Sequence, residues 1–347
     1  MRGCIIETDV SAPGPLVTRP FFIVGCPRSG TTLLRSLLRS HPNLTIPWET
    51  HFIPSFYRAF GDPSSDQEAW QLACRILKFP RVAFWGITAK EQDFSGCRSL
   101  SGVTRRLFEI WAKKEGKPRW GDKTPHYVRE IPLLVRLFPD AQVIHIVRDG
   151  RDVALSWLRT RFEPLNLYTA ARLWKEMVTR GRFDGALLAA DAYLELRYEA
   201  LLADPEATMR RACEFLNEAY DPAVLCPAIV PGDQRWLVAS RAGRHQPPSG
   251  VILRDNAGKW RSTMTLRQRA LFESVAGDLL GDLGYPVEGL ARKLSRGEKM
   301  LRAADHRLRH LARALWRLRR PYGRSAAVST GWARLRALLR PQVPPAG

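Results

Sequence analysis

The sequence predicts an α/β protein of three layers, with a central and mainly parallel sheet covered by helices on both faces. Short apolar runs, of which 142–147 is the clearest, have the length and composition of strands buried on both faces, as in parallel sheets. They alternate with amphipathic segments of helical length, a pattern that favours strand–helix–strand units. The chain of 347 residues, 45% of them hydrophobic, is long enough to bury one large core.

The elements follow in order along the chain. A strand is expected at 21–25, then a helix at 30–40 that ends at His41-Pro42, and a short extended piece at 44–46. Residues 51–118 have a mostly helical pattern. Beyond them the pattern predicts a helix at 125–138, a strand at 142–147, helices at 150–160 and 167–190, a strand at 192–197, and helices at 205–218 and 265–280.

Composition divides the chain into three expected parts: an irregular leader at 1–19, a main domain at 20–289 and a basic tail at 290–347. Residues 290–340 contain 15 Lys and Arg against 2 Asp and Glu, so they carry +13 of the net charge of +20. The segment 290–320 is expected to be an arginine-rich amphipathic helix, with leucines at heptad-like spacing at 301, 308, 311, 315 and 318.

The loop between the first strand and the first helix has the sequence Gly25-Cys26-Pro27-Arg28-Ser29-Gly30-Thr31-Thr32. Such a loop directs backbone N–H groups and the positive end of a helix at one point, which suits a phosphate or sulfate group. The nucleoside-triphosphate form of the loop has a lysine after its second glycine. Here Thr31 takes that position and the cation is Arg28, inside the loop. The loop therefore favours an anion other than a magnesium-bound triphosphate.

This loop resembles the 5′-phosphosulfate loop of sulfotransferases that use 3′-phosphoadenosine-5′-phosphosulfate (PAPS). Its Pro-Arg-Ser-Gly-Thr-Thr form is similar to the tyrosylprotein and carbohydrate branches, and we take the chain to be of bacterial type. A second motif, at 143–156, resembles the family's 3′-phosphate motif, in which a strand ends in an arginine, here Arg148, and a serine, here Ser156, follows eight positions later. The two motifs occur in the expected order.

The resemblance implies a P-loop NTPase-like sulfotransferase fold and transfer of the sulfuryl group of PAPS to a hydroxyl, leaving 3′,5′-bisphosphoadenosine (PAP). The acceptor could be a sugar, a tyrosine or other phenol, or a lipid-linked molecule. Residues 51–118 would then form an acceptor-side cap. The residues implied in nucleotide binding are Arg28, Ser29, Gly30, Thr31 and Thr32 at the 5′ side, Arg148 and Ser156 at the 3′-phosphate, and Tyr198 and Lys259 as further contacts.

Catalysis needs a base for the acceptor proton and positive charge at the transferring group. In the tyrosylprotein branch a glutamate base follows the loop arginine by the interval from Arg28 to Glu49 here, although a glutamate there could also serve to cap a helix. Lys123 resembles the family's catalytic lysine, with an ion pair to Asp122 or a neighbour as the alternative, and Arg28 would share its role. His126 is the second candidate base, because cytosolic relatives have a histidine shortly after that lysine. His51 is the third.

Two other classes of function were weighed. A P-loop kinase or NTPase should have a lysine at position 31 and an acidic magnesium ligand after a later strand, but the strand at 142–147 is followed by Arg148. A binding protein for nucleic acid or another polyanion would explain the basic charge, yet that charge is concentrated in the tail. No metal is expected, since sulfuryl transfer requires none, and the six scattered cysteines form no C-x-x-C pair.

The start of the chain shows no apolar segment typical of a signal peptide or an anchor, so we expect a cytoplasmic protein. The tail helix could dock its leucines on the main domain, lie on an anionic membrane surface or bind an acidic partner. A specific nucleic-acid partner is not expected. The oligomeric state stays open.

Overall fold

The structure, a computed structural model, describes residues 19–160, 164–226 and 255–319. Its centre is a five-stranded sheet in the order β2-β3-β1-β4-β5, in which every neighbouring pair is parallel. The strands are β1 (Phe21–Val24), β2 (Leu44–Thr45), β3 (Arg119–Lys123), β4 (Gln142–Val147) and β5 (Tyr193–Arg197). The expected parallel sheet is confirmed.

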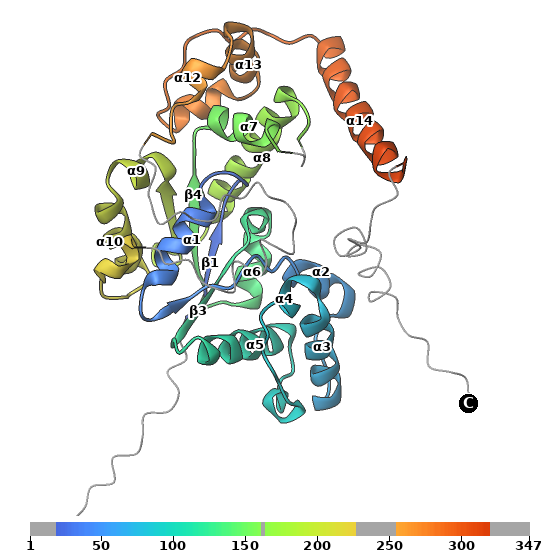
Figure 1. Cartoon of the computed structure of the whole chain (residues 1–347), viewed down its shortest axis with the longest axis vertical. Helices are drawn as coiled ribbons and strands as arrows, with labels where there is room; N and C mark the ends of the chain where they lie inside the picture. Colours follow the sequence, from blue (N-terminus) through green and yellow to red (C-terminus); the bar gives the residue numbers. More distant parts are fainter. Residues whose placement is uncertain (1–18, 161–163, 227–254, 320–347) are drawn as a thin grey trace, which may run out of the picture.

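Alternate residues of the strands enter two separate cores, as the period of two requires. Phe21 and Ile23 of β1 pack with the helices α1 (Thr31–Ser40), α9 (Tyr198–Ala203) and α10 (Pro205–Phe215) and with the 3₁₀ turn η3 (Pro222–Leu225). Phe22 and Val24 face the other core, where the helices α5 (Leu100–Lys114), α6 (Ile131–Leu137), α7 (Gly150–Leu158) and α8 (Leu167–Gly185) pack. The sheet is therefore the middle of three layers (Figure 1).

The part at 51–118 is helical, as the sequence predicts, and lies at one end of the molecule (Figure 1). Besides α5 it consists of α2 (Ile53–Phe60), α3 (Asp66–Lys78), α4 (Pro80–Ala83) and η1 (Glu91–Phe94). Its aromatic side chains continue the second core; Phe108 stacks on Trp120 of β3 with ring centroids 4.4 Å apart. Packing of this kind fixes the helical part rigidly to the strand that ends at Lys123.

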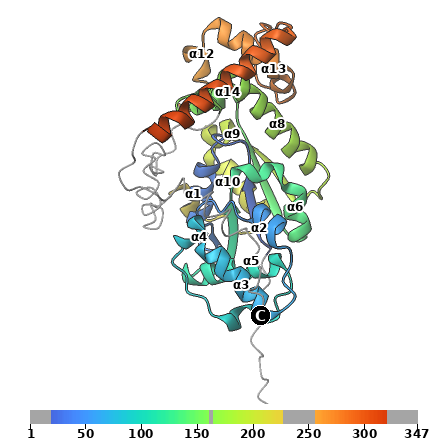
Figure 2. The ribbon, with the colours of Figure 1, turned by 90° about the vertical axis from the view of Figure 1, so that its right-hand side faces the viewer.

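The opposite end of the molecule is built from α12 (Trp260–Thr263), α13 (Leu266–Asp282) and α14 (Arg296–Arg319). Trp174 of α8 packs against Phe272 of α13, with ring centroids 5.8 Å apart. Figure 2 shows α14 crossing this end as a separate rod. No helix in the described ranges is both long enough and apolar enough to cross a membrane.

The expected helix at 125–138 is wrong as a single element. The structure has a 3₁₀ turn, η2 (Pro125–Arg129), followed by α6, which starts at Ile131. Pro132 explains the break, because a proline inside a continuous helix lacks the N–H and clashes with the carbonyl four residues earlier, whereas it fits the first turn of a new helix. His126 therefore lies in a tight turn directly after β3.

Other expected elements are confirmed with small shifts of their ends. The helix expected at 167–190 ends at Gly185, the one at 205–218 ends at Phe215, and the tail helix begins at Arg296. Residues 1–18 of the expected leader, residues 227–254 and the tail from 320 lie outside the described residues. The domain boundaries at 19/20 and 289/290 stay predictions.

Candidate functional site

Four strands end at one edge of the sheet, and each is followed by residues that the sequence singles out. β1 runs into the glycine loop, β3 ends at Lys123, and β4 and β5 are followed by Arg148 and Tyr198. Ligands of open parallel sheets bind at this carboxyl edge. The sheet therefore gathers residues that are up to 170 positions apart in the sequence, from Arg28 to Tyr198.

The glycine loop has a strained and crowded backbone. Arg28 has φ +78°, a left-handed conformation that is uncommon for a residue with a side chain, and such outliers cluster at functional sites. Gly30 has φ +94°, and a Cβ placed there would lie 2.2 Å from the ring of Tyr198. The ring thus closes directly over the start of α1, which only glycine permits.

Two arginines meet in this loop. The Arg28 side chain donates from Nε to Ser156 Oγ at 2.9 Å, and Arg148 Nη1 donates to the backbone carbonyl of Arg28 at 3.2 Å. Burial lowers the pKa of Arg28, and the charge of Arg148 lowers it further. Ser156 is therefore brought to Arg28, whereas the sequence paired it with Arg148. Two neighbouring guanidinium groups are stabilised by an anion that both can bind.

Some buried polar atoms at this edge lack a hydrogen-bond partner among the described residues. They include Ser29 Oγ in the loop and Arg148 Nε. Buried donors normally have partners, and exceptions call for an explanation such as a missing ligand. Together with the positive N-terminal end of α1, these atoms could bind one anionic group at the loop.

Lys123 and Glu49 form a close ion pair beside the loop. The Lys123 side chain is fully buried, and its Nζ lies 2.7 Å from Glu49 Oε1, 3.3 Å from Thr32 Oγ1 and 4.8 Å from the centre of the Trp48 ring. The carboxyl of Glu49 is 22% exposed. Burial alone would raise the pKa of Glu49, but Lys123 and His51 together hold it well below its usual range. Glu49 is thus ionised at neutral pH.

Both histidines that the sequence offers as bases stand next to Glu49. His51 Nε2 lies 3.0 Å from Glu49 Oε2, and the rings of His51 and His126 are 5.6 Å apart. Burial lowers the pKa of His51 and lowers that of His126 to about 4, so both are neutral at pH 7. His51 has φ +58°, a second left-handed residue at the site. Arg81 of α4 reaches the same carboxylate, with Nη1 3.7 Å from Oε2.

The alternative for Lys123, an ion pair to Asp122 or a neighbour, is formed with a neighbour: Lys123 pairs with Glu49 and not with Asp122. The Asp122 carboxyl lies on the opposite side of β3 and accepts hydrogen bonds from the hydroxyls of Thr50 and Thr124, at 3.0 Å for Thr124. Burial raises the pKa of Asp122 to about 7, against the hydrogen bonds that lower it. Asp122 thus ties the segment that carries Glu49 to the end of β3.

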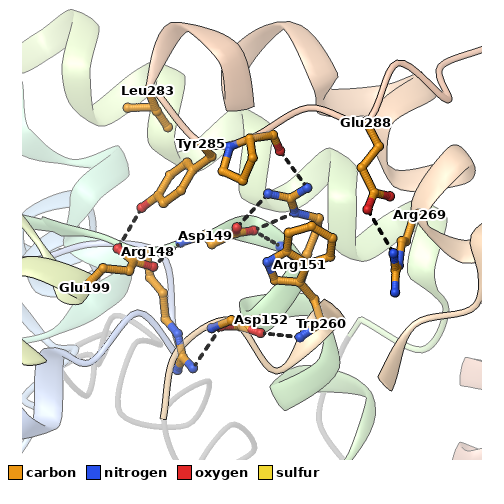
Figure 3. A network of polar contacts seen from close by, with 12 residues as sticks. Arg148, Asp149, Arg151, Asp152, Glu199, Trp260, Arg269, Leu283, Tyr285 and Glu288 are labelled. Carbon is orange, nitrogen blue, oxygen red and sulfur yellow. Dashed lines mark hydrogen bonds and ion pairs between the residues drawn. The ribbon is translucent and has the colours of Figure 1, made fainter. Parts of the chain in front are cut away.

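Two acidic residues, Asp149 and Asp152, lie at the start of α7. Asp149 caps α7 by accepting from the N–H of Arg151, and the Arg151 guanidinium returns two hydrogen bonds to the same carboxylate (Figure 3). Asp152 accepts instead from the backbone N–H groups of Gly258 and Trp260, at 2.7 and 2.9 Å. The exposed Lys259 stands between those two residues, so the structure brings it to the same end of β4 as Arg148.

Sequence reasoning missed two residues of this edge, Asn256 and Trp260. The Asn256 carbonyl accepts from Arg148 Nη2 at 2.6 Å, and its amide donates to the Tyr198 hydroxyl at 2.7 Å. The Arg151 guanidinium lies 3.5 Å from the centre of the buried Trp260 ring. Their short segment shows no periodicity, and only the Gly-Lys-Trp sequence signals it.

Comparison with known proteins agrees with this geometry. Residues 20–222 match the model of a family described as "Sulfotransferase family". The chain is similar to protein-tyrosine sulfotransferase A of Caenorhabditis elegans, with 28% identity over 275 residues that cover 77% of this chain and 68% of that protein. It is also similar to the nodulation protein NoeE of Sinorhizobium fredii, with 28% identity over 346 residues that cover 92% of this chain and 77% of that protein.

Among solved structures, the chain is similar to the sulfotransferase domain from the curacin biosynthetic pathway. The match covers 78% of this chain and 99% of that domain, with a TM-score of 0.55 and 24% sequence identity. At this identity the similarity shows the fold, and it confirms the sulfotransferase-type α/β architecture expected from the loop and the parallel sheet.

Proposed function

The chain belongs to the sulfotransferase family, and on that premise we propose that it transfers the sulfuryl group of PAPS to a hydroxyl group of an acceptor, with PAP as the second product. The observation that carries the proposal is the meeting of Arg28, Arg148 and Ser156 at the carboxyl edge of the sheet. As a member of this family, the protein is a transferase.

The donor would lie across this edge. The loop residues Ser29, Gly30 and Thr31, with the guanidinium of Arg28, would hold the 5′-phosphosulfate at the start of α1. Arg148 would bind the 3′-phosphate, and the ring of Tyr198, 4.4 Å from the Arg148 guanidinium, would keep that side chain in place. The Ser29 hydroxyl and Arg148 Nε, which lack partners among the described residues, would gain them from the donor.

Glu49 would accept the proton of the acceptor hydroxyl. The carboxylate is ionised, partly exposed and fixed by Lys123 and His51, so it faces the acceptor side as a positioned base. Proton removal lets the hydroxyl oxygen form a bond to sulfur while the bond from sulfur to the phosphate oxygen breaks. Lys123 and Arg28 would stabilise the negative charge that then develops on the leaving PAP.

Three variants separate the candidate bases. Glu49→Gln should lower turnover by about 10²- to 10⁴-fold and leave PAP affinity nearly unchanged, whereas His126→Ala and His51→Ala should lower turnover far less. Full activity of Glu49→Gln with an inactive His126→Ala would move the role to His126.

The activity itself is tested with sulfur-labelled PAPS and a panel of tyrosine peptides, simple phenols, sugars and lipid-linked sugars. Transfer of label to one hydroxyl class, together with tighter binding of PAP than of adenosine 5′-phosphate, is the expected result. Tight binding of ATP with magnesium and none of PAP would instead favour a kinase or NTPase and overturn the proposal.

The tail helix supports a proposal on location: a cytoplasmic protein held at the inner surface of an anionic membrane. The polar side of α14 is attached to the start of α8, because Asn166 Nδ2 donates to the Arg302 carbonyl at 2.8 Å and to Asp305 at 2.9 Å. Leu308 and Leu311 point elsewhere and are 65% and 55% exposed, whereas Leu301, 72% exposed, lines a pocket with Leu167 and Leu271. The docking of Leu308 and Leu311 on the main domain is therefore wrong; the side chains of Leu315 and Leu318 lie outside the described residues.

An exposed apolar stripe within a segment that carries +13 fits the interface of an anionic bilayer. The full chain should sediment with phosphatidylglycerol vesicles at low salt and be released as salt rises, because charges are screened over about 10 Å at 0.1 M. Leu308→Glu with Leu311→Glu should abolish sedimentation, whereas Leu187→Glu, an equally exposed leucine outside α14, should not. Sedimentation unaffected by the α14 changes would refute the proposal, as would concentration-dependent self-association in place of vesicle binding.

A further inference from the structure

The segment 256–260 is held against the nucleotide edge from two directions, both of which start on α7. Asp152 binds the backbone of Gly258 and Trp260, and Arg151 covers the Trp260 ring at 3.5 Å (Figure 3). Arg151 is itself fixed by Asp149, whose backbone N–H donates to Glu199 at 2.9 Å. The first turn of α7 therefore works as a clamp on a segment more than 100 positions away.

Asp152 also faces the arginine of the 3′-phosphate motif. Its Oδ2 lies 3.7 Å from Arg148 Nη2, across the junction between the end of β4 and the first turn of α7. The same Arg148 nitrogen donates to the carbonyl of Asn256 at 2.6 Å. Two of the groups that orient the guanidinium therefore depend on Asp152: one is its own carboxylate, and the other is the segment that it holds. The Arg28 carbonyl and the Tyr198 ring hold the guanidinium from the loop side.

Charged residues face Asp152 from several elements packed against it, including Arg261 and Arg269, which lie against the Trp260 ring. Arg148 and Asp149 stand before it on the same strand end, Arg151 and Glu273 lie towards α13, and Glu199 lies at the start of α9. The Asp152 side chain is almost fully buried. A carboxylate in this place has no access to solvent and can act only through Arg148 and the 256–260 backbone.

We propose that Asp152 is a positioning residue for recognition of the 3′-phosphate: by holding Gly258 and Trp260 it places Lys259 and Arg148 on either side of that phosphate. Asp152 itself touches no substrate. The proposal rests on the proposed function, since it presumes a nucleotide with a 3′-phosphate. It also makes residues 256–260 part of the donor site.

The test compares the affinities for PAP and for adenosine 5′-phosphate, measured by calorimetry on the full chain. Asp152→Asn keeps the shape of the side chain but loses one acceptor and the charge. We expect the affinity for PAP to fall by about 10- to 100-fold, the usual effect of losing a hydrogen bond to a charged group. Affinity for adenosine 5′-phosphate should change by less than about threefold, because no 3′-phosphate is bound. A merely structural role would lower both affinities together.

Two further variants sharpen the result. Asp255→Asn removes the same charge from the exposed residue directly before this segment and should leave both affinities unchanged. Lys259→Met should weaken PAP binding in the parent chain but have little further effect beside Asp152→Asn, because the lysine is then no longer in place. Strictly additive losses, or an unchanged ratio of the two affinities in Asp152→Asn, would overturn the proposal.

The parent chain separates this proposal from the proposed function. If it does not prefer PAP to adenosine 5′-phosphate, the function itself fails. If it does and Asp152→Asn has the same preference, only the positioning role is refuted.

Discussion

Replacing Glu49 by glutamine should destabilise the protein as well as inactivate it, because the Lys123 ammonium is fully buried and would lose its counter-ion. Removing one partner of a buried ion pair costs about 3–5 kcal/mol. Since the Glu49 carboxyl is 22% exposed, the lower end applies, about 3 kcal/mol. At about 2 °C per kcal/mol for a chain of this size, the Tm should fall by about 6 °C.

The loss of thermal stability in Glu49→Gln should depend on pH in a defined direction. Burial already lowers the pKa of Lys123, and Glu49 is the main group that raises it, so Glu49→Gln lowers it further. A lysine whose pKa is lower in the folded state than in the unfolded state destabilises the fold fully at pH values below the folded pKa. This destabilisation falls as pH rises past the folded pKa and is lost at the unfolded pKa of about 10.4. The Tm difference between Glu49→Gln and the parent should therefore be largest at low pH and shrink as pH rises towards about 10.

The double variant Glu49→Gln/Lys123→Met is the matched control. It has no unpaired buried charge, so its Tm should return close to that of the parent chain, while transfer activity stays lost. Differential scanning fluorimetry over the pH range measures all three proteins. The reasoning is refuted if Glu49→Gln has the parent Tm at every pH, or if the double variant is less stable than Glu49→Gln alone.

Three further outcomes are expected. Arg148→Ala should lower PAP affinity by about 30-fold or more in calorimetry, the usual cost of removing a charged partner, and leave adenosine 5′-phosphate binding nearly intact. Asp122→Asn should raise the Tm at pH 8 but not at pH 5. The pKa of the Asp122 carboxyl rises to about 7 on folding, so this carboxyl lowers the stability of the protein by up to about 4 kcal/mol as pH rises from 4 through 7. Gly30→Ala should abolish PAP binding through its clash with Tyr198, whereas Gly116→Ala, at φ +67° with open space around it, should bind normally.

The sequence predicts the sheet and the glycine loop because their signals are local. A buried strand such as 142–147 is a short apolar run whatever surrounds it, and the loop needs only its own glycines and Arg28. Arg148 follows from the same rule, since it comes directly after that strand. The pattern does not predict the strand that ends at Lys123, so Lys123 comes from the resemblance alone. Pro132 also marks a helix start in the sequence. The single helix expected at 125–138 is wrong because the apolar pattern continues across this proline, whereas the helix does not.

Other features depend on contacts that no local pattern encodes. The Ser156 hydroxyl accepts a hydrogen bond from Arg28 because the left-handed backbone of Arg28 directs its side chain across the loop. The roles of Asn256 and Trp260 depend on a segment that returns to the sheet after a stretch outside the described residues. The leucines of α14 face outwards because the polar side of the helix is attached to Asn166. The heptad spacing alone does not tell which side of the helix faces the main domain.

Both motifs depend on distant segments, but on different ones. The glycine loop supplies its backbone, Arg28 and the start of α1, while Ser156 accepts from Arg28 and the Tyr198 ring closes over Gly30. The second motif depends on residues beyond 255, because Arg148 donates to the Asn256 carbonyl and faces Asp152, which accepts from the backbone N–H groups of Gly258 and Trp260. The family model ends at residue 222, yet the chain closes its nucleotide edge with residues beyond 255. Recognition of the 3′-phosphate should thus be the first property lost when the contacts between α7 and α12 are disturbed, before the fold of the sheet.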